Sequence, residues 1–87
     1  MKTIIVISED NHGTIGYAYD VYSAVMFLLN DHWIDEDTVI DELGTTIKEK
    51  FGMLWRDELT GLTIDQFNDL FYDSNFLLSE QKIIWFP

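Results

Sequence analysis

The sequence predicts a single small α+β domain, in which helices pack on one face of an antiparallel sheet. Three observations lead to this fold class. A β-branched run and an alternating segment near the N-terminus are separated by a polar turn, a strongly apolar helical segment follows, and two capping boxes lie in the second half. The order of these signals predicts the arrangement ββαααββ for residues 1–87 as one domain.

The N-terminal part is predicted to form a β-hairpin. Residues 3–8 are a continuous, mostly β-branched run, which is typical of a strand buried on both faces. Residues 9–13 form a polar turn that ends in a glycine, which takes a positive φ at little cost. Residues 14–19 then alternate, and their small face would let a helix approach closely. Their larger side chains are expected on the opposite face: Ile15, Tyr17 and Tyr19.

The next segment is predicted to be the central core helix. Asp20 is a suitable N-cap for a helix over about residues 21–31, because its carboxylate can accept a hydrogen bond from the first turn. Apolar residues recur on one stripe of this helix, and further large side chains widen it. Such an apolar helix is expected at the centre of the core.

Two capping boxes predict the remaining helices. Thr46 with Glu49 opens a helix that is expected to pause at Gly52 and to resume through residue 59. Thr63 with Gln66 opens a helix over about residues 64–71. The chain is then expected to close with a second hairpin, whose strands at 76–78 and 82–86 flank a turn at Ser79–Gln81.

Composition narrows the classes of function. The net charge of −11 argues against direct binding to nucleic acid or to an anionic membrane, and favours a basic protein surface as partner. The chain has no cysteine, which excludes disulfides, thiolate metal sites and a thiol nucleophile. The apolar run at the N-terminus is too short for a signal peptide or a membrane span. A cytoplasmic protein is therefore expected.

Negative charge is concentrated in one stretch of the chain. Nine acidic residues and neither lysine nor arginine lie between Lys2 and Lys48. Apolar residues are interleaved with these acids, which indicates a folded surface in place of a disordered acidic tail. The predicted partner-binding residues are the six carboxylates of the stretch, Asp31, Asp35, Glu36, Asp37, Asp41 and Glu42, with Glu9, Asp10 and Asp20 as extensions.

No motif points to catalysis, so the chain is expected not to be an enzyme. His12 is expected in an exposed turn, and His32 near a helix C-terminus, where the dipole favours a cation. The acidic stretch has the oxygen ligands that Ca²⁺ or Mg²⁺ would need, but it has neither the spacing nor the glycine of a calcium loop. Residues 11–16 match no phosphate-binding glycine pattern. No cofactor or metal is predicted.

The segment Ile7–Gly13, the apolar helix that ends near Trp33, and the segment Ile47–Gly52 together resemble a loose group of small acidic proteins encoded by phages and prophages of Gram-positive bacteria. The resemblance extends over most of the chain and carries no functional residue with it. It implies a setting: small acidic accessory proteins of phages often counter host defence, as anti-CRISPR or anti-restriction inhibitors do. The cell interior of a bacterial host is the compartment this implies.

Two hypotheses of different classes follow. The first is a non-enzymatic inhibitor whose carboxylates stand where phosphates would, in the basic nucleic-acid groove of a host nuclease. The second is a regulatory or structural module that forms a homodimer or recruits a partner through exposed aromatic side chains. Charge-led binding should weaken steeply with salt, and aromatic-led binding should not. The aromatic interface is predicted at Tyr17, Tyr19, Trp85 and Phe86.

Overall fold

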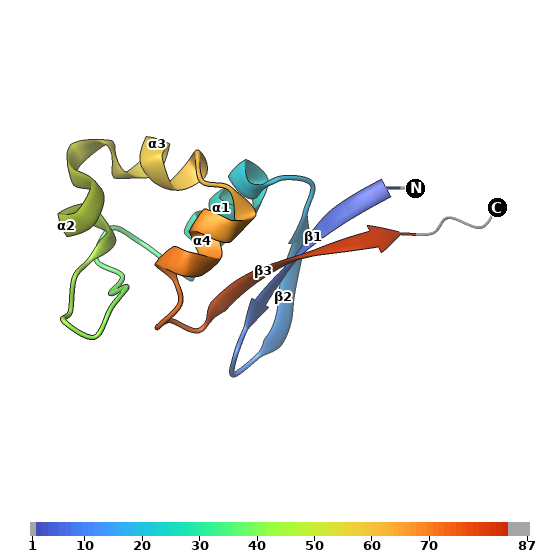
Figure 1. Cartoon of the computed structure of the whole chain (residues 1–87), viewed down its shortest axis with the longest axis horizontal. Coiled ribbons are helices and arrows are strands. Elements are labelled where there is room, and N and C mark those ends of the chain that lie inside the picture. Colours follow the sequence, from blue (N-terminus) through green and yellow to red (C-terminus); the bar gives the residue numbers. More distant parts are fainter. Residues whose placement is uncertain (1, 84–87) are drawn as a thin grey trace.

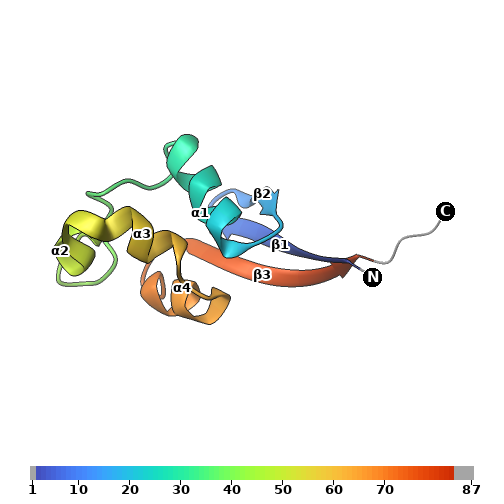
Figure 2. The ribbon, with the colours of Figure 1, turned by 90° about the horizontal axis from the view of Figure 1, so that it is seen from above.

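The computed structural model of the protein describes residues 2–83. Along the chain its elements are β1 (Lys2–Glu9), β2 (Gly13–Ala18), α1 (Val21–Asn30), α2 (Ile47–Phe51), the 3-10 turn η1 (Gly52–Leu54), α3 (Trp55–Thr60), α4 (Ile64–Leu70) and β3 (Phe76–Ile83). Within these residues the sheet has the order β2-β1-β3, and both pairs of strands are antiparallel. The helices lie on one side of the sheet (Figures 1 and 2). The predicted α+β class is confirmed.

A β-bulge in the first hairpin corrects the predicted alternation of β2. Ile7 pairs with Gly16 but the next residue of β1, Ser8, pairs with Thr14, so Ile15 is an extra residue on β2. The bulge lets Ile15 pack against the core, away from the face that carries Tyr17. The turn itself is as predicted, with its glycine at a φ of 72°.

The predicted closing hairpin is wrong within the described residues. β3 runs without a break through Ser79–Gln81 and pairs with β1 over its whole length, with Ser79 opposite Val6. The end of the sheet that contains the C-terminal half of β3 extends past the helices (Figure 1). Polar side chains there meet solvent on either face, so they do not interrupt the strand. The second strand predicted for this hairpin continues into residues 84–86, which lie outside the described residues.

One asparagine of α4 fixes this helix to the edge of the sheet. The Asn68 Nδ2 donates to the carbonyl oxygen of Leu78 at 2.9 Å, and the Leu78 amide donates to the Asn68 Oδ1 at 2.8 Å. The side-chain amide thereby occupies the place that a neighbouring strand would take beside β3. The pair of bonds sets the position of α4 over the sheet.

The helix starts follow the sequence closely. The Asp20 carboxylate accepts a hydrogen bond of 2.7 Å from the Ser23 amide and caps α1. Both predicted capping boxes are present, at the starts of α2 and α4. The predicted pause at Gly52 is the short 3-10 turn between α2 and α3, and Gly52 has a φ of 75°.

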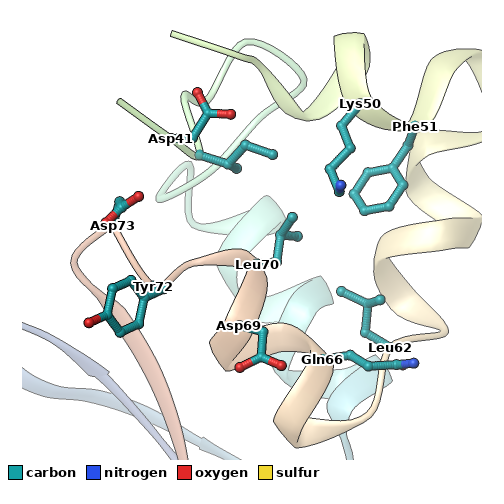
Figure 3. A pocket seen from close by; sticks show the side chains of 10 residues that line it. Asp41, Lys50, Phe51, Leu62, Gln66, Asp69, Leu70, Tyr72 and Asp73 are labelled. Carbon is teal, nitrogen blue, oxygen red and sulfur yellow. The ribbon is translucent and has the colours of Figure 1, made fainter. Parts of the chain in front are cut away.

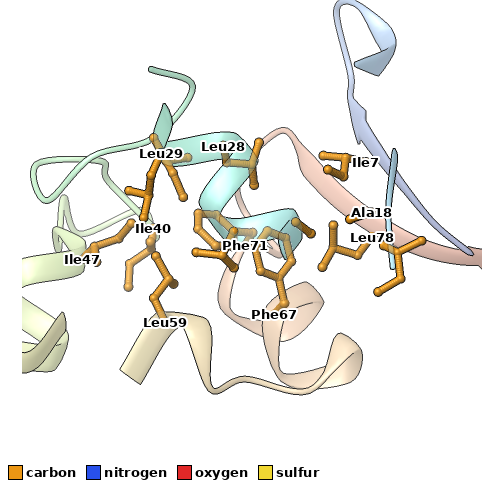
Figure 4. Close-up of a cluster of buried hydrophobic side chains, with 14 residues drawn as sticks. Ile7, Ala18, Leu28, Leu29, Ile40, Ile47, Leu59, Phe67, Phe71 and Leu78 are labelled. Carbon is orange, nitrogen blue, oxygen red and sulfur yellow. The ribbon is translucent and has the colours of Figure 1, made fainter. Parts of the chain in front are cut away.

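The core lies between the sheet and the helices. Figure 4 shows side chains from the sheet, from all four α-helices and from the segment after α1 meeting in one cluster. Phe67 and Phe71 of the α4 region are its largest members, and their ring centroids lie 4.5 Å apart. The other labelled members of the cluster are Ile7, Ala18, Leu28, Leu29, Ile40, Ile47, Leu59 and Leu78.

Candidate functional site

The acidic stretch after α1 forms an ordered loop, residues 31–46, which we call the acidic loop. Two buried side chains anchor it to the core, Ile34 and Ile40, which are 2% and 6% exposed. The backbone of α2 adds further ties, since the Ile47 amide donates to the Thr38 carbonyl and the Lys48 amide to the Glu36 carbonyl, both at 3.0 Å. The carboxylates are therefore presented from a fixed backbone.

Two of these carboxylates build the turns of the acidic loop. Asp35 accepts a hydrogen bond of 2.8 Å from the Asp37 amide. Asp41 accepts bonds of 3.0 Å each from the amides of Leu43 and Thr45. The bonds from Thr45 are the main reason why the pKa of Asp41 is lowered, and the Leu43 amide adds to the effect. Substitution of either aspartate would change the shape of the loop as well as its charge.

The side chains of the other acids of the loop accept no hydrogen bond from its backbone. Glu36 forms an ion pair with Lys48, with 3.3 Å between its Oε2 and the lysine Nζ, and both side chains remain about half exposed. Within residues 2–83, the three remaining side chains are exposed and have no hydrogen-bonded or ion-paired partner: Asp31, Asp37 and Glu42.

The three acids expected to extend this surface differ from one another. Asp10 is exposed in the β1–β2 turn, and Asp20 is exposed while it caps α1. Glu9 is 5% exposed, so it does not belong to the acidic surface. Its Oε2 bonds to Nδ1 of His12, and its Oε1 accepts a bond of 3.1 Å from the Asn11 amide. The bond from His12 is the main cause that lowers the pKa of Glu9, and the Asn11 amide adds to it.

We expect the Glu9 carboxylate to stabilise the fold in a pH-dependent way. Because its folded pKa lies below the ordinary value of 4.5, its contribution is complete above that pH and is lost as the pH falls through the folded pKa. Glu9→Gln should therefore lower the urea midpoint at about pH 6 and match the wild type at about pH 2. Glu80→Gln removes an exposed carboxylate of β3 and serves as the control. If Glu9→Gln lowered the urea midpoint by the same amount at about pH 2 as at about pH 6, this role would be contradicted.

A cavity of about 430 Å³ lies between the acidic loop and α4 (Figure 3). Apolar side chains from four segments form its floor: Ile40, Phe51, Leu62 and Leu70. Asp41, Asp69 and Asp73 line it together with one base, Lys50. In Figure 3, Asp41 and Asp73 lie along one rim, and the Lys50 side chain enters from the α2 side. An apolar floor with carboxylates at its rim suits a long side chain that ends in a positive charge.

Asp69 and Asp73 are members of this site that the predicted set of binding residues does not contain. Asp65, Asp69 and Asp73 recur at intervals of four residues, which places them on one side of a helix and its end. That spacing is visible in the sequence. It does not show that the helix lies beside Asp41, because this contact joins segments about thirty residues apart in the chain.

The acids of the loop do not all face the same way. Asp35 and Glu36 border a second cavity, of about 400 Å³, together with His32, Trp55 and Arg56. His32 has a positive φ of 61°, which turns the chain out of α1 toward this cavity. Bases are close on this side, since Lys48 pairs with Glu36 and Arg56 lines the cavity. The α4 side of the loop has the larger excess of negative charge.

Two of the four residues predicted to form an aromatic interface are exposed. Tyr17 and Tyr19 are 64% and 77% exposed, and the Lys2 Nζ lies 5.8 Å from the centroid of the Tyr19 ring. Trp85 and Phe86 lie outside the described residues. The acidic loop and the tyrosines therefore belong to separate surfaces, one beside the helices and one on the sheet.

Comparisons of the chain with protein-family models, with curated proteins and with solved structures gave no match. Among residues 2–83, no three His, Asp or Glu side chains are placed to hold a metal ion together. In the same part of the chain, no helix combines the length and the apolar character that crossing a bilayer requires.

Proposed function

We propose that this chain is a non-enzymatic binding protein that covers a basic, nucleic-acid-binding surface of another protein. The observation that carries the proposal is the cavity between the acidic loop and α4, where three carboxylates and one lysine surround an apolar floor. An arginine or lysine of the partner would bury its aliphatic part against Phe51 and Leu70 and place its charge beside Asp69 and Asp73.

The acidic loop would extend this contact. Asp37 and Glu42 are exposed and face no base among the described residues, so a basic groove would meet them at little cost in broken ion pairs. The net charge of −11 would attract such a partner from a distance and speed association. The resemblance to acidic phage proteins suggests the setting: a host nuclease of a defence system, inhibited in the cytoplasm of the host cell.

The first test measures binding of the full chain to a short arginine-rich peptide by calorimetry. Asp69→Lys with Asp73→Lys should weaken binding at least about tenfold, because two attractive charges at the cavity become repulsive. Asp57→Lys with Glu58→Lys changes the net charge equally on exposed positions of α3 that line neither cavity, and should have a much smaller effect. Equal weakening by both pairs would contradict a specific site.

The acidic loop is tested with Asp37→Lys and Glu42→Lys, since neither side chain builds a turn. The wild-type affinity should fall steeply between about 0.05 M and 0.5 M salt. Capture of partners from a bacterial lysate at these two salt concentrations, with the Asp69/Asp73 variant as comparison, would then identify the protein bound. Displacement of DNA or RNA from that protein is the expected result, and a captured protein that keeps its nucleic acid would overturn the proposal.

A further inference from the structure

The sheet has a second face, opposite the helices, which we call the open face. It consists of the even-numbered residues of β1 from Lys2 to Ser8, the odd-numbered residues of β3 from Leu77 to Ile83, and Thr14 and Tyr17 of β2, because these residues are paired across the strands. Their neighbours Ile5, Ile7 and Leu78 point to the core. No helix within residues 2–83 lies on the open face (Figure 1).

Among the described residues, the open face has five apolar side chains and no acidic one, and Lys2 at its end is its one charged residue. Tyr17, Leu77 and Ile83 are 64%, 48% and 44% exposed, whereas Val6, which lies between Tyr17 and Ser79, is only 6% exposed. Both acids of the three strands, Glu9 and Glu80, are on the helix side of the sheet. None of the 16 acids of the chain is therefore on the open face of the three strands.

We propose that the open face binds a second copy of this chain, in a dimer with two-fold symmetry. The distribution of charge selects this partner. A basic protein would gain no attraction from a face without carboxylates, whereas a second copy brings an equally apolar surface and leaves the acids of both chains on the outside. Carboxylates are depleted and tyrosine is enriched in the buried part of protein interfaces as well.

The size of the open face sets the strength of the association. Three strands about 4.8 Å apart and about 25 Å long span a flat area of roughly 300–400 Å². This is below the roughly 800 Å² that each partner contributes to a standard stable interface. A weak dimer is therefore expected, which forms in concentrated solution and dissociates on dilution.

Salt should act on this dimer in the direction opposite to its effect on the proposed basic partner. Two chains of net charge −11 repel each other, and added salt screens that repulsion while the apolar contact remains. Self-association should therefore strengthen at about 0.5 M salt relative to about 0.05 M. The pairs Asp69→Lys with Asp73→Lys and Asp37→Lys with Glu42→Lys, which test the acidic site, should leave the dimer intact.

The test is sedimentation velocity of the full chain over a concentration series at both salt concentrations. The mass of 10.2 kDa should rise toward twice that value, more readily in high salt. Tyr17→Lys and Leu77→Lys should each raise the dissociation constant at least about tenfold, because each places a charge in the contact. Tyr72→Lys is the matched control, since Tyr72 is 82% exposed beside α4 and the change of charge is the same.

Two substitutions on different strands keep the test decisive if one of them disturbs folding, which far-UV circular dichroism would detect. Amide signals of β1 and β3 should also shift with concentration while those of α3 stay constant. A wild-type chain that remains at monomer mass through the series in both salts would overturn the proposal. Equal weakening by Tyr72→Lys would overturn it as well.

Discussion

Replacing Phe67 with alanine should cost about 3–5 kcal/mol of the free energy of unfolding. Phe67 is completely buried, and its ring packs 4.5 Å from that of Phe71. Two more aromatic contacts follow, since the ring centroids of Phe71 and Phe76 are 5.9 Å apart and those of Phe76 and Trp33 are 6.3 Å apart. These rings join α4 to β3 and to the acidic loop, so the cavity left by Phe67→Ala would loosen several elements at once.

This loss is a large fraction of the total free energy of unfolding. Native domains have roughly 0.05–0.15 kcal/mol of stability per residue, which is about 4–13 kcal/mol for a chain of this length. Urea unfolding followed by far-UV circular dichroism should show the midpoint shift, or a chain that is partly unfolded without urea. Tyr72→Ala removes an exposed aromatic ring from the neighbouring turn and should change the stability by no more than about 0.5 kcal/mol. An unaltered midpoint for Phe67→Ala would contradict the position of α4.

Replacing Gly16 with valine should cost about 1–3 kcal/mol through overpacking. Gly16 lies on the core side of β2, and a Cβ built there would come within 2.7 Å of Cζ and 2.9 Å of Cε1 of the Phe27 ring. Phe27 belongs to α1 and is half buried against the core, so the ring has to move and the packing of α1 on β2 changes. The higher β-propensity of valine offsets only a part of this cost.

Gly16→Ala gives a graded comparison, because its single methyl meets the same ring. Thr14→Val adds an apolar β-branched residue at an exposed position of the same strand and is the matched control. Thermal unfolding should rank the variants as wild type near Thr14→Val, then Gly16→Ala, then Gly16→Val. A fully stable Gly16→Val would show that α1 packs farther from the sheet than the structure indicates. Gly16 faces the core and Tyr17 faces the other side of the strand, so the two Gly16 variants test the fold separately from the proposed dimer.

The parts of the fold that the sequence predicts well are those with local causes. The Asp20 cap and the boxes at Thr46 and Thr63 depend on residues three positions apart, and all three are present. Gly16 and Ala18 of the predicted small face are on the core side of β2, but Ile15 packs there too, and an aromatic ring of α1 approaches Gly16 in place of the helix backbone.

The parts that could not be predicted depend on contacts between distant segments. The polar run Ser79–Gln81 has the composition of a turn, and only its pairing with β1 holds it in an extended conformation. The bulge at Ile15 follows from packing against the core and leaves no local signal. The site shows the same division, because the acids of the loop are evident in the sequence and their approach to Asp69 and Asp73 is not.

The bonds between Asn68 and Leu78 have a consequence for the behaviour of the chain in concentrated solution. An edge strand with open amides and carbonyls is a template for aggregation into cross-β fibrils. On β3 the polar groups of Leu78 are already satisfied by Asn68, and the charged residues Glu80 and Lys82 follow it. At the opposite edge, the bulge and the glycines of β2 make a poor template. Growth from strand to strand is thus hindered at both edges, so association across the open face would stop at a pair of chains.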